Sequence, residues 1–152
     1  MANEDDFTKL EMAAWGGLLG MHARLFKEIE ADLAASAGIS HAEFEVLLRL
    51  SWAEGRRLRL QELAERSILT RSGMSRVVER LEKAGLVTRE AAREDGRGAY
   101  AVLTRQGLGE FRKALRSHVA LVRRLFLKRF SARELEQMSE FWSRTWQSLP
   151  GH

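Results

Sequence analysis

Hydrophobic residues recur at helical spacing over most of the chain, and the first such segment runs from about residue 6 to residue 35. Its apolar stripe consists of Leu10, Ala14, Leu18, Leu25, Ile29 and Leu33, widened by Trp15, Leu19, Met21, His22 and Phe26. A single packing surface seldom needs so broad a stripe. The pattern therefore predicts a long helix that contacts both its own core and a further surface. The small residues at 35–38 are expected to end it.

Three shorter elements are expected to follow this helix. Ser40 and Glu43 form a capping-box pattern, which predicts a second helix that ends at Glu54-Gly55. Residues 58–60 alternate as a minimal strand does, and residues 61–67 have the spacing of a short helix. The apolar face of the second helix is expected to comprise Phe44, Leu47, Leu48 and Trp52.

The stretch 70–85 predicts the helix around which the other elements are arranged. Thr70 suits its N-cap, and Gly85 suits a left-handed residue after its last turn. Its core-facing side is expected to hold Met74, Val77, Leu81 and Ala84. Its outward positions are Arg71, Ser72, Ser75, Arg76, Glu79, Arg80 and Lys83.

Arginines and hydroxyls are the side chains that reach DNA phosphates and base edges, so this helix suits the major groove. An ordinary solvated helix is the alternative. The short helix and tight turn before it complete the sequence form of a helix-turn-helix. A generic two-helix hairpin shares that form and remains open on this pattern alone.

After Gly85 the apolar pattern changes from helical to alternating, which predicts strands at 86–90 and 99–103. Asp95-Gly96 between them is a tight-turn signal. A hairpin directly after a recognition-type helix is a wing, and Arg97 at its tip suits a narrow minor groove. The alternative is an exposed loop arginine; the position after the helix-turn-helix pattern favours the wing.

Two helices are expected at the C-terminal end, over about 105–129 and from Ser131 to residue 149. Ser131 and Glu134 form another capping-box pattern. The last helix carries Phe141, Trp142 and Trp146, and leaving large apolar side chains exposed costs about 1.5–3 kcal/mol each. Pairing with a second copy would bury them and the broad N-terminal stripe, which predicts a homodimer. The alternative is that the terminal helices cover each other within a monomer.

Composition narrows the function classes. The 152 residues carry a net charge of +4, but residues 1–55 are net acidic, and both 56–105 and 106–152 are net basic. Concentrated arginine near the 70–85 helix is typical of a nucleic-acid binder. The absence of cysteine excludes disulfides and thiol-based sensing. The apolar runs are too short to span a membrane and no signal peptide is visible, so we expect a cytoplasmic protein.

Several motifs together resemble the MarR family of bacterial transcriptional regulators over nearly the full length of the chain. They are Leu63-Ala64-Glu65, Leu69-Thr70-Arg71-Ser72, the run from Val77 to Val87, Asp95-Gly96-Arg97, Leu103-Thr104 and Gly107. The resemblance implies a mainly α fold with a small β-hairpin wing. It implies a winged helix-turn-helix lobe at 39–104 and a helical dimerisation lobe formed by 6–38 and 105–149.

The resemblance also implies how DNA would be bound. A homodimer would bind a pseudo-palindromic double-stranded operator, most often as a repressor that responds to a ligand. The matching positions of the recognition helix are Thr70, Arg71, Ser72, Ser75, Arg76 and Arg80. In the wing, Asp95 would hold Arg97 in place as it enters the minor groove.

A small-molecule effector, such as an anionic aromatic compound, is expected in the crevice between the dimerisation helices and the winged lobe. Candidates to line it are Trp15, His22, Arg49 and His118. For Trp15 the alternative is a core position, and for the histidines it is pairing with backbone or carboxylate groups. The four scattered histidines show no metal-ligand spacing, so we expect no metal and no cofactor.

An enzyme is not expected. The chain lacks a glycine-rich phosphate loop, a nucleophile-elbow pattern and paired carboxylates in an evident cleft. A basic helical adaptor that binds acidic proteins would satisfy the composition, but it would give no reason for the wing.

Overall fold

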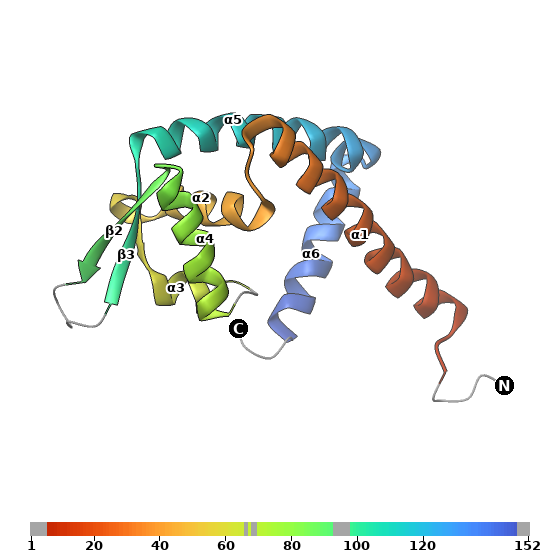
Figure 1. The fold of residues 1–152 in the computed structure, drawn as a ribbon. Coiled ribbons are helices and arrows are strands. Elements are labelled where there is room, and N and C mark those ends of the chain that lie inside the picture. Colours follow the sequence, from red (N-terminus) through yellow and green to blue (C-terminus); the bar gives the residue numbers. More distant parts are fainter. Residues whose placement is uncertain (1–5, 66, 68–69, 93–97, 149–152) are drawn as a thin grey trace. The chain divides into compact units, whose positions relative to one another are not determined.

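A computed structural model describes residues 6–65, 67, 70–92 and 98–148 (Figure 1). The chain divides into two compact units after His118, and each unit is described here by itself. The first unit contains the winged lobe and the long N-terminal helix. The second contains the last helical segments.

Helix α1 (Lys9–Ala37) begins three residues later than the hydrophobic pattern suggested, because Thr8 and Glu11 form a capping box. The Thr8 amide donates to Glu11 Oε2 at 2.8 Å, and Thr8 Oγ1 accepts from the Glu11 amide at 3.2 Å. The helix ends at Gly38, whose φ of 65° is the left-handed conformation that glycine adopts readily. The predicted end of this helix is therefore confirmed to within two residues.

Helix α2 (His41–Trp52) begins at the capping box of Ser40 and Glu43, as the sequence predicts. The short 3₁₀ turn η1 (Glu54–Arg56) follows and leads into strand β1 (Arg57–Arg59). This strand lies one residue earlier than predicted, since Leu60 already belongs to the next helix.

The helix-turn-helix consists of α3 (Leu60–Glu65) and α4 (Arg71–Lys83). Strands β2 (Val87–Ala92) and β3 (Gly98–Leu103) pair antiparallel after it. The predicted hairpin of β2 and β3 is confirmed, and the predicted minimal strand joins it to give a sheet of order β1-β3-β2. The outer edge of β3 also pairs with β1, which satisfies backbone groups that a lone hairpin would leave exposed.

The core of the first unit lies between α2, α4, the sheet and the first half of α5 (Arg105–Leu125). Phe44 of α2 and Phe111 of α5 meet with their ring centroids 5.6 Å apart. The largest side chains that are almost wholly buried are Leu33, Leu47, Leu50, Leu63, Met74 and Leu81. The core therefore fixes the side of α4 that faces inward.

Three apolar residues assigned to packed faces from the sequence are exposed instead. Ala84 is exposed, because α4 ends at Lys83 and Gly85 turns the chain with a φ of 72°. Trp52 at the end of α2 is 78% exposed. Trp15 is 51% exposed, because the N-terminal half of α1 extends beyond α2 and the sheet (Figure 1).

In the second unit, α5 ends at Leu125, four residues before its predicted end, and the 3₁₀ turn η2 (Leu127–Arg129) follows. Phe126 between them leaves the helical conformation, with φ −125° and ψ −67°. Helix α6 (Ala132–Ser148) then begins at the predicted capping box of Ser131 and Glu134. Its residues Phe141, Trp142 and Trp146 are all about half-exposed.

Candidate nucleic-acid interface

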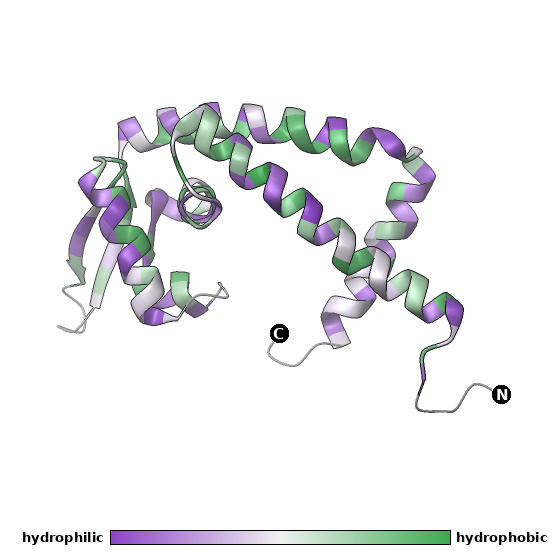
Figure 2. Ribbon diagram, turned by 45° about the vertical axis from the view of Figure 1, so that its right-hand side comes forward, coloured by the Kyte–Doolittle hydropathy of each residue, from purple (hydrophilic) through white to green (hydrophobic). Residues whose placement is uncertain are grey.

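Helix α4 is amphipathic in the way that a helix bound in a groove requires. Its buried face consists of Met74, Val77, Val78 and Leu81, which pack into the core of the first unit. The N-cap Thr70 accepts a hydrogen bond of 3.1 Å from the Gly73 amide. All six predicted recognition positions from Thr70 to Arg80 are exposed, so the structure brings them together on the outward surface of one helix. Figure 2 shows this alternation of hydrophobic and hydrophilic residues along the helix.

The first half of α4 carries cations that no described residue neutralises. Within the described part of the chain, the side chains of Arg71 and Arg76 make no hydrogen bond or ion pair. Ser72 and Ser75 lie exposed beside them, and Ser72 Oγ is 3.1 Å from Thr70 Oγ1. Unpaired guanidinium groups and hydroxyls near a helix N-terminus suit phosphates and base edges.

The second half of α4 is different, because its cations are already paired. Lys83 Nζ lies 2.7 Å from Glu79 Oε1 one turn earlier. The hydrogen bond from Lys83 holds the pKa of the Glu79 carboxyl below its ordinary value. Arg80 Nε lies 2.8 Å from Glu43 Oε1 of α2. The charge available to an anionic partner is therefore concentrated in the first two turns.

Strand β2 also contacts the recognition helix, through a residue that the sequence did not single out. Arg89 Nη2 donates to the Ser75 carbonyl at 3.0 Å, and Arg89 Nε lies 3.5 Å from Glu82 Oε2. The register pairs Arg89 with buried Ala101, which places the two side chains on the same face of the sheet. An arginine at an inward position of a short predicted strand could have indicated this contact from the sequence.

The predicted wing residues Asp95 and Arg97 lie outside the described residues. What the structure shows is the ladder that leads to them, in which Ala92 pairs with Gly98. The wing itself thus has its two strands and its position directly after α4.

The segment that follows β3, from Thr104 to Gly107, packs closely against the end of the recognition helix α4. Thr104 Oγ1 donates to the Gly85 carbonyl at 2.8 Å and accepts from the Gly107 amide at 2.9 Å. The Thr104 amide donates to the Leu86 carbonyl at 3.1 Å. These bonds join the C-terminus of α4 to the N-terminus of α5, and they give the Leu-Thr-x-x-Gly motif a structural reason.

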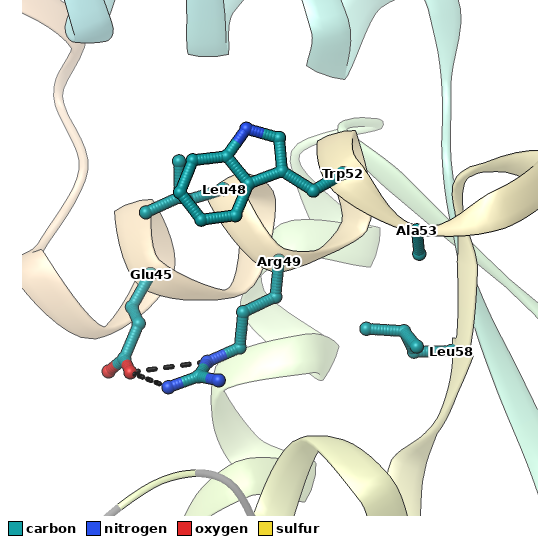
Figure 3. A pocket seen from close by; sticks show the side chains of 6 residues that line it. All are labelled: Glu45, Leu48, Arg49, Trp52, Ala53 and Leu58. Carbon is teal, nitrogen blue, oxygen red and sulfur yellow. Dashed lines mark hydrogen bonds and ion pairs between the residues drawn. The ribbon is translucent and has the colours of Figure 1, made fainter.

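Two of the four predicted effector residues, Arg49 and His22, line different pockets of the described chain. Arg49 belongs to a pocket of about 290 Å³ beside α2, where it pairs with Glu45 (Figure 3). His22 belongs to a second pocket, of about 480 Å³, between α1 and α2. Trp15 lines neither of these pockets, and it is about half-exposed on α1.

The pocket between α1 and α2 has an aromatic wall. The rings of His22 and Phe26 are stacked with centroids 5.8 Å apart, and Phe26 meets His41 at 5.0 Å. Its apolar lining is completed by Leu25, Ile29 and Ala42, and its carboxylates belong to Glu30 and Glu45. Glu45 also lines the pocket of Figure 3, so the two pockets adjoin along α2.

His118 lies within α5, in its second half, against Phe44 with ring centroids 5.0 Å apart. Burial, together with the nearby His41, holds the pKa of the His118 imidazole below its ordinary value, and Asp32 opposes this shift. Ser117 donates to Asp32 Oδ1 at 2.8 Å. Asp32 Oδ2 and His118 Nδ1 are buried with no hydrogen-bond partner among the described residues. Pairing of His118 with a carboxylate, the alternative considered from the sequence, is therefore not made at Nδ1.

Among the described residues, no group of three or more histidine, aspartate or glutamate side chains is arranged to hold a metal ion. No helix in the described ranges 6–65, 70–92 and 98–148 is both long and apolar enough to cross a membrane.

Comparison with known proteins identifies the architecture built from these parts. A sequence profile described as the MarR family matches residues 37–98. The chain is 30% identical to Sco3205, a MarR family transcriptional regulator from Streptomyces coelicolor whose structure is in complex with DNA. That match has a TM-score of 0.90 and covers 99% of this chain and 94% of the other.

Two further relatives agree with this result. AbsC, another MarR family transcriptional regulator from Streptomyces coelicolor, is 34% identical with a TM-score of 0.90, over 97% of this chain and 99% of its own. The HTH-type transcriptional regulator PapX of Escherichia coli is 27% identical over 129 residues, 83% of this chain and 69% of its own. The likeness covers the long terminal helices as well as the winged lobe, and the chain therefore belongs to the MarR family of transcriptional regulators.

Proposed function

We propose that the chain is a ligand-responsive repressor that binds a pseudo-palindromic operator as a homodimer in the cytoplasm. The family makes it a DNA-binding regulator rather than an enzyme. The observation that carries the proposal is the division of α4: among the described residues Arg71 and Arg76 have no partner, while Arg80 and Lys83 are neutralised. Thr70, Ser72 and Ser75 complete the proposed reading surface.

The proposed wing contact adds a second point of attachment to each half-site. Arg97 would enter the minor groove beside the major groove that α4 occupies, and Asp95 would orient it. Supporting this, β2 and β3 form a regular ladder up to Ala92 and Gly98, and Arg89 fastens β2 to α4. The helix and the wing would then approach the duplex as one body.

We propose that two parts of the chain have separate roles. Residues 39–104 would bind DNA, and residues 6–38 together with 105–149 would form the dimer. Apolar side chains are exposed along α1, and another group is exposed on α6. They are Phe7, Leu10, Met12, Trp15, Leu18, Leu19, Met21 and Phe26 on or just before α1, and Phe141, Trp142 and Trp146 on α6. A second copy would bury them and set two α4 helices ~34–36 Å apart, one helical turn of DNA.

For the effector we propose the pockets along α2. A planar aromatic compound would stack against His22, Phe26 and His41, all of which line the larger pocket. If the effector is anionic, its charge would compete with Glu45 for the guanidinium of Arg49. A ligand there changes the free energy of one helix arrangement relative to another, which is how it would alter operator affinity.

The decisive experiment is a titration of DNA fragments flanking the chain's own gene, read by mobility shift. We expect saturable binding that survives competition by unrelated DNA. An absence of any sequence-dependent binding would contradict the proposal and favour an adaptor that binds acidic proteins.

A further inference from the structure

Arg80 occupies an outward position of α4, but its guanidinium group is directed to another helix of the lobe. Its Nε lies 2.8 Å from Oε1 of Glu43, which precedes it by 37 residues. The Glu43 side chain is only 12% exposed, whereas that of Arg80 is 55% exposed. The carboxylate is thus the fixed partner, and the arginine reaches down to it.

Glu43 is held in place by the N-terminus of α2. Its Oε2 accepts from the Ser40 amide at 2.8 Å and lies 3.1 Å from Ser40 Oγ. Burial acts to raise the pKa of this carboxyl, but the hydrogen bonds from Ser40 and Arg80 outweigh it and leave the pKa below its ordinary value. Glu43 therefore remains a carboxylate with one oxygen on the cap and the other on Arg80.

We propose that Arg80 is a positioning residue, which fixes the recognition helix to the N-terminus of α2 through Glu43 instead of contacting the operator. This inference rests on the proposed function, because it assumes that α4 reads DNA. It separates Arg80 from Arg71 and Arg76, which have no such partner in the described chain.

The lobe has a physical need for such a contact. The buried face of α4 packs through Met74, Val77 and Leu81, and apolar contacts are not directional. A binding site requires its side chains to be held within about 0.5 Å of their productive positions. Directional polar contacts hold α4 in place on two sides, one from Glu43 of α2 and one from Arg89 of β2.

The turn that holds Glu43 also receives α1. Glu30 Oε1 accepts a hydrogen bond of 3.1 Å from the His41 amide, at the first residue of α2. Three helices therefore meet at this one turn, each through a carboxylate or a guanidinium group. The N-terminal turn of α2 is thus in polar contact with α1 as well as with α4.

The test uses Glu43→Gln, since glutamine also suits the last position of a capping box and only the charge pair is lost. We expect Glu43→Gln and Arg80→Met each to weaken operator binding about three- to tenfold, tenfold being 1.4 kcal/mol. The double variant should be no weaker than either single variant, because both remove the same contact. The salt dependence of binding should stay unchanged, since no phosphate contact is lost.

A direct contact between Arg80 and DNA would give the opposite pattern. Arg80→Met would then reduce the slope of log affinity against log salt by roughly 0.9, the value for one phosphate. Glu43→Gln would free the guanidinium group and leave operator affinity unchanged or higher. Either result would overturn the proposal.

Two control variants isolate the effect. Ser40→Ala removes the same helix cap but keeps the pair of Glu43 and Arg80, so it should lower the urea midpoint while operator affinity stays within twofold. Arg76→Met removes an outward arginine that has no partner among the described residues, and it should change the salt slope or the base preference. A loss of affinity in Ser40→Ala as large as in Glu43→Gln would mean that cap stability is responsible, which contradicts a positioning role.

A measurement without DNA keeps this inference separate from the proposed function. If the wild-type chain binds no operator, the proposed function fails, but the effect of Glu43 on α4 is still measurable by amide hydrogen exchange. Glu43→Gln and Arg80→Met should speed exchange across residues 74–81 to the same extent, and Ser40→Ala should not. Unchanged exchange in both variants would overturn the positioning role itself.

Discussion

A methyl group added to Gly107 would overlap the carbonyl oxygen of Leu86, far inside van der Waals contact. That carbonyl accepts the amide of Thr104, so it cannot move away without breaking a bond between the sheet and α5. The first turn of α5 is thus pressed directly onto the chain that leaves the recognition helix.

Gly107→Ala should therefore destabilise the fold by about 1–3 kcal/mol or more, as forced overpacking does. Gly109→Ala is the matched control, because a methyl group there meets nothing within 4 Å. In the exposed helix that control should gain about 0.5–1 kcal/mol from the better helix propensity of alanine. Urea unfolding of both variants measures the difference, and equal stabilities would contradict the close approach.

Features that depend on near neighbours in sequence could be predicted. The capping boxes at Ser40 and Ser131 lie where the pattern put them, as do Thr70 as N-cap and Gly85 after α4. Each needs only a hydroxyl, a carboxylate or a glycine within one turn of the helix end. Such interactions are encoded over three or four residues.

Features that depend on distant partners could not be predicted. The sequence marks Arg80 as outward, but only the fold brings Glu43 within hydrogen-bond distance of it. In the same way, β1 pairs with β3 across more than 40 residues of chain, which a local pattern of alternation does not specify. Trp15 lies in the apolar stripe of α1, yet it is 51% exposed, because burial depends on what covers a side chain.

For the proposed wing, Arg97→Ala should weaken operator binding and flatten its salt dependence. Without this phosphate-neutralising cation, binding releases one counterion fewer. The slope of log affinity against log salt concentration is then lower by about 0.9. Lys113→Ala is a suitable control, since Lys113 Nζ is paired with Glu110 at 2.7 Å on α5. Fluorescence anisotropy at several salt concentrations gives the slope. An unchanged slope and affinity for Arg97→Ala would exclude the wing contact.

Arg76→Ala should relax base preference at one defined position of the operator. Arg76, which pairs with no side chain in the described part of the chain, can bond a guanine through both of its terminal nitrogens, and such pairs contribute ~1–3 kcal/mol of discrimination. The measurement compares wild type and variant over a set of operators with single base-pair changes. A uniform weakening over all of them would show that Arg76 contacts phosphate only.

The proposed homodimer can be tested with Trp15→Glu. Because the indole is 51% exposed in one copy, a charge there leaves the monomer fold intact but opposes burial against a partner. We expect sedimentation velocity to show a shift to monomer and operator affinity to fall with it. Trp52→Glu, at a residue 78% exposed on α2, is the control and should stay dimeric. A dimeric Trp15→Glu variant would place the interface elsewhere.

His118 should make stability depend on pH below neutrality. Burial and the neighbouring His41 lower the pKa of its imidazole in the folded chain, against the opposing influence of Asp32. The unfolded chain then binds a proton at higher pH than the folded one, so this contribution to stability is complete above about pH 6.5 and decreases as the pH falls through the folded pKa.

His118→Gln should remove that part of the pH dependence of the unfolding free energy, whereas His22→Gln, at an exposed position of α1, should retain it. Urea unfolding at pH 7.5 and 5.5, values of roughly one unit either side of an ordinary histidine pKa, gives the comparison. The same loss of stability in wild type and His118→Gln would show that another group is responsible.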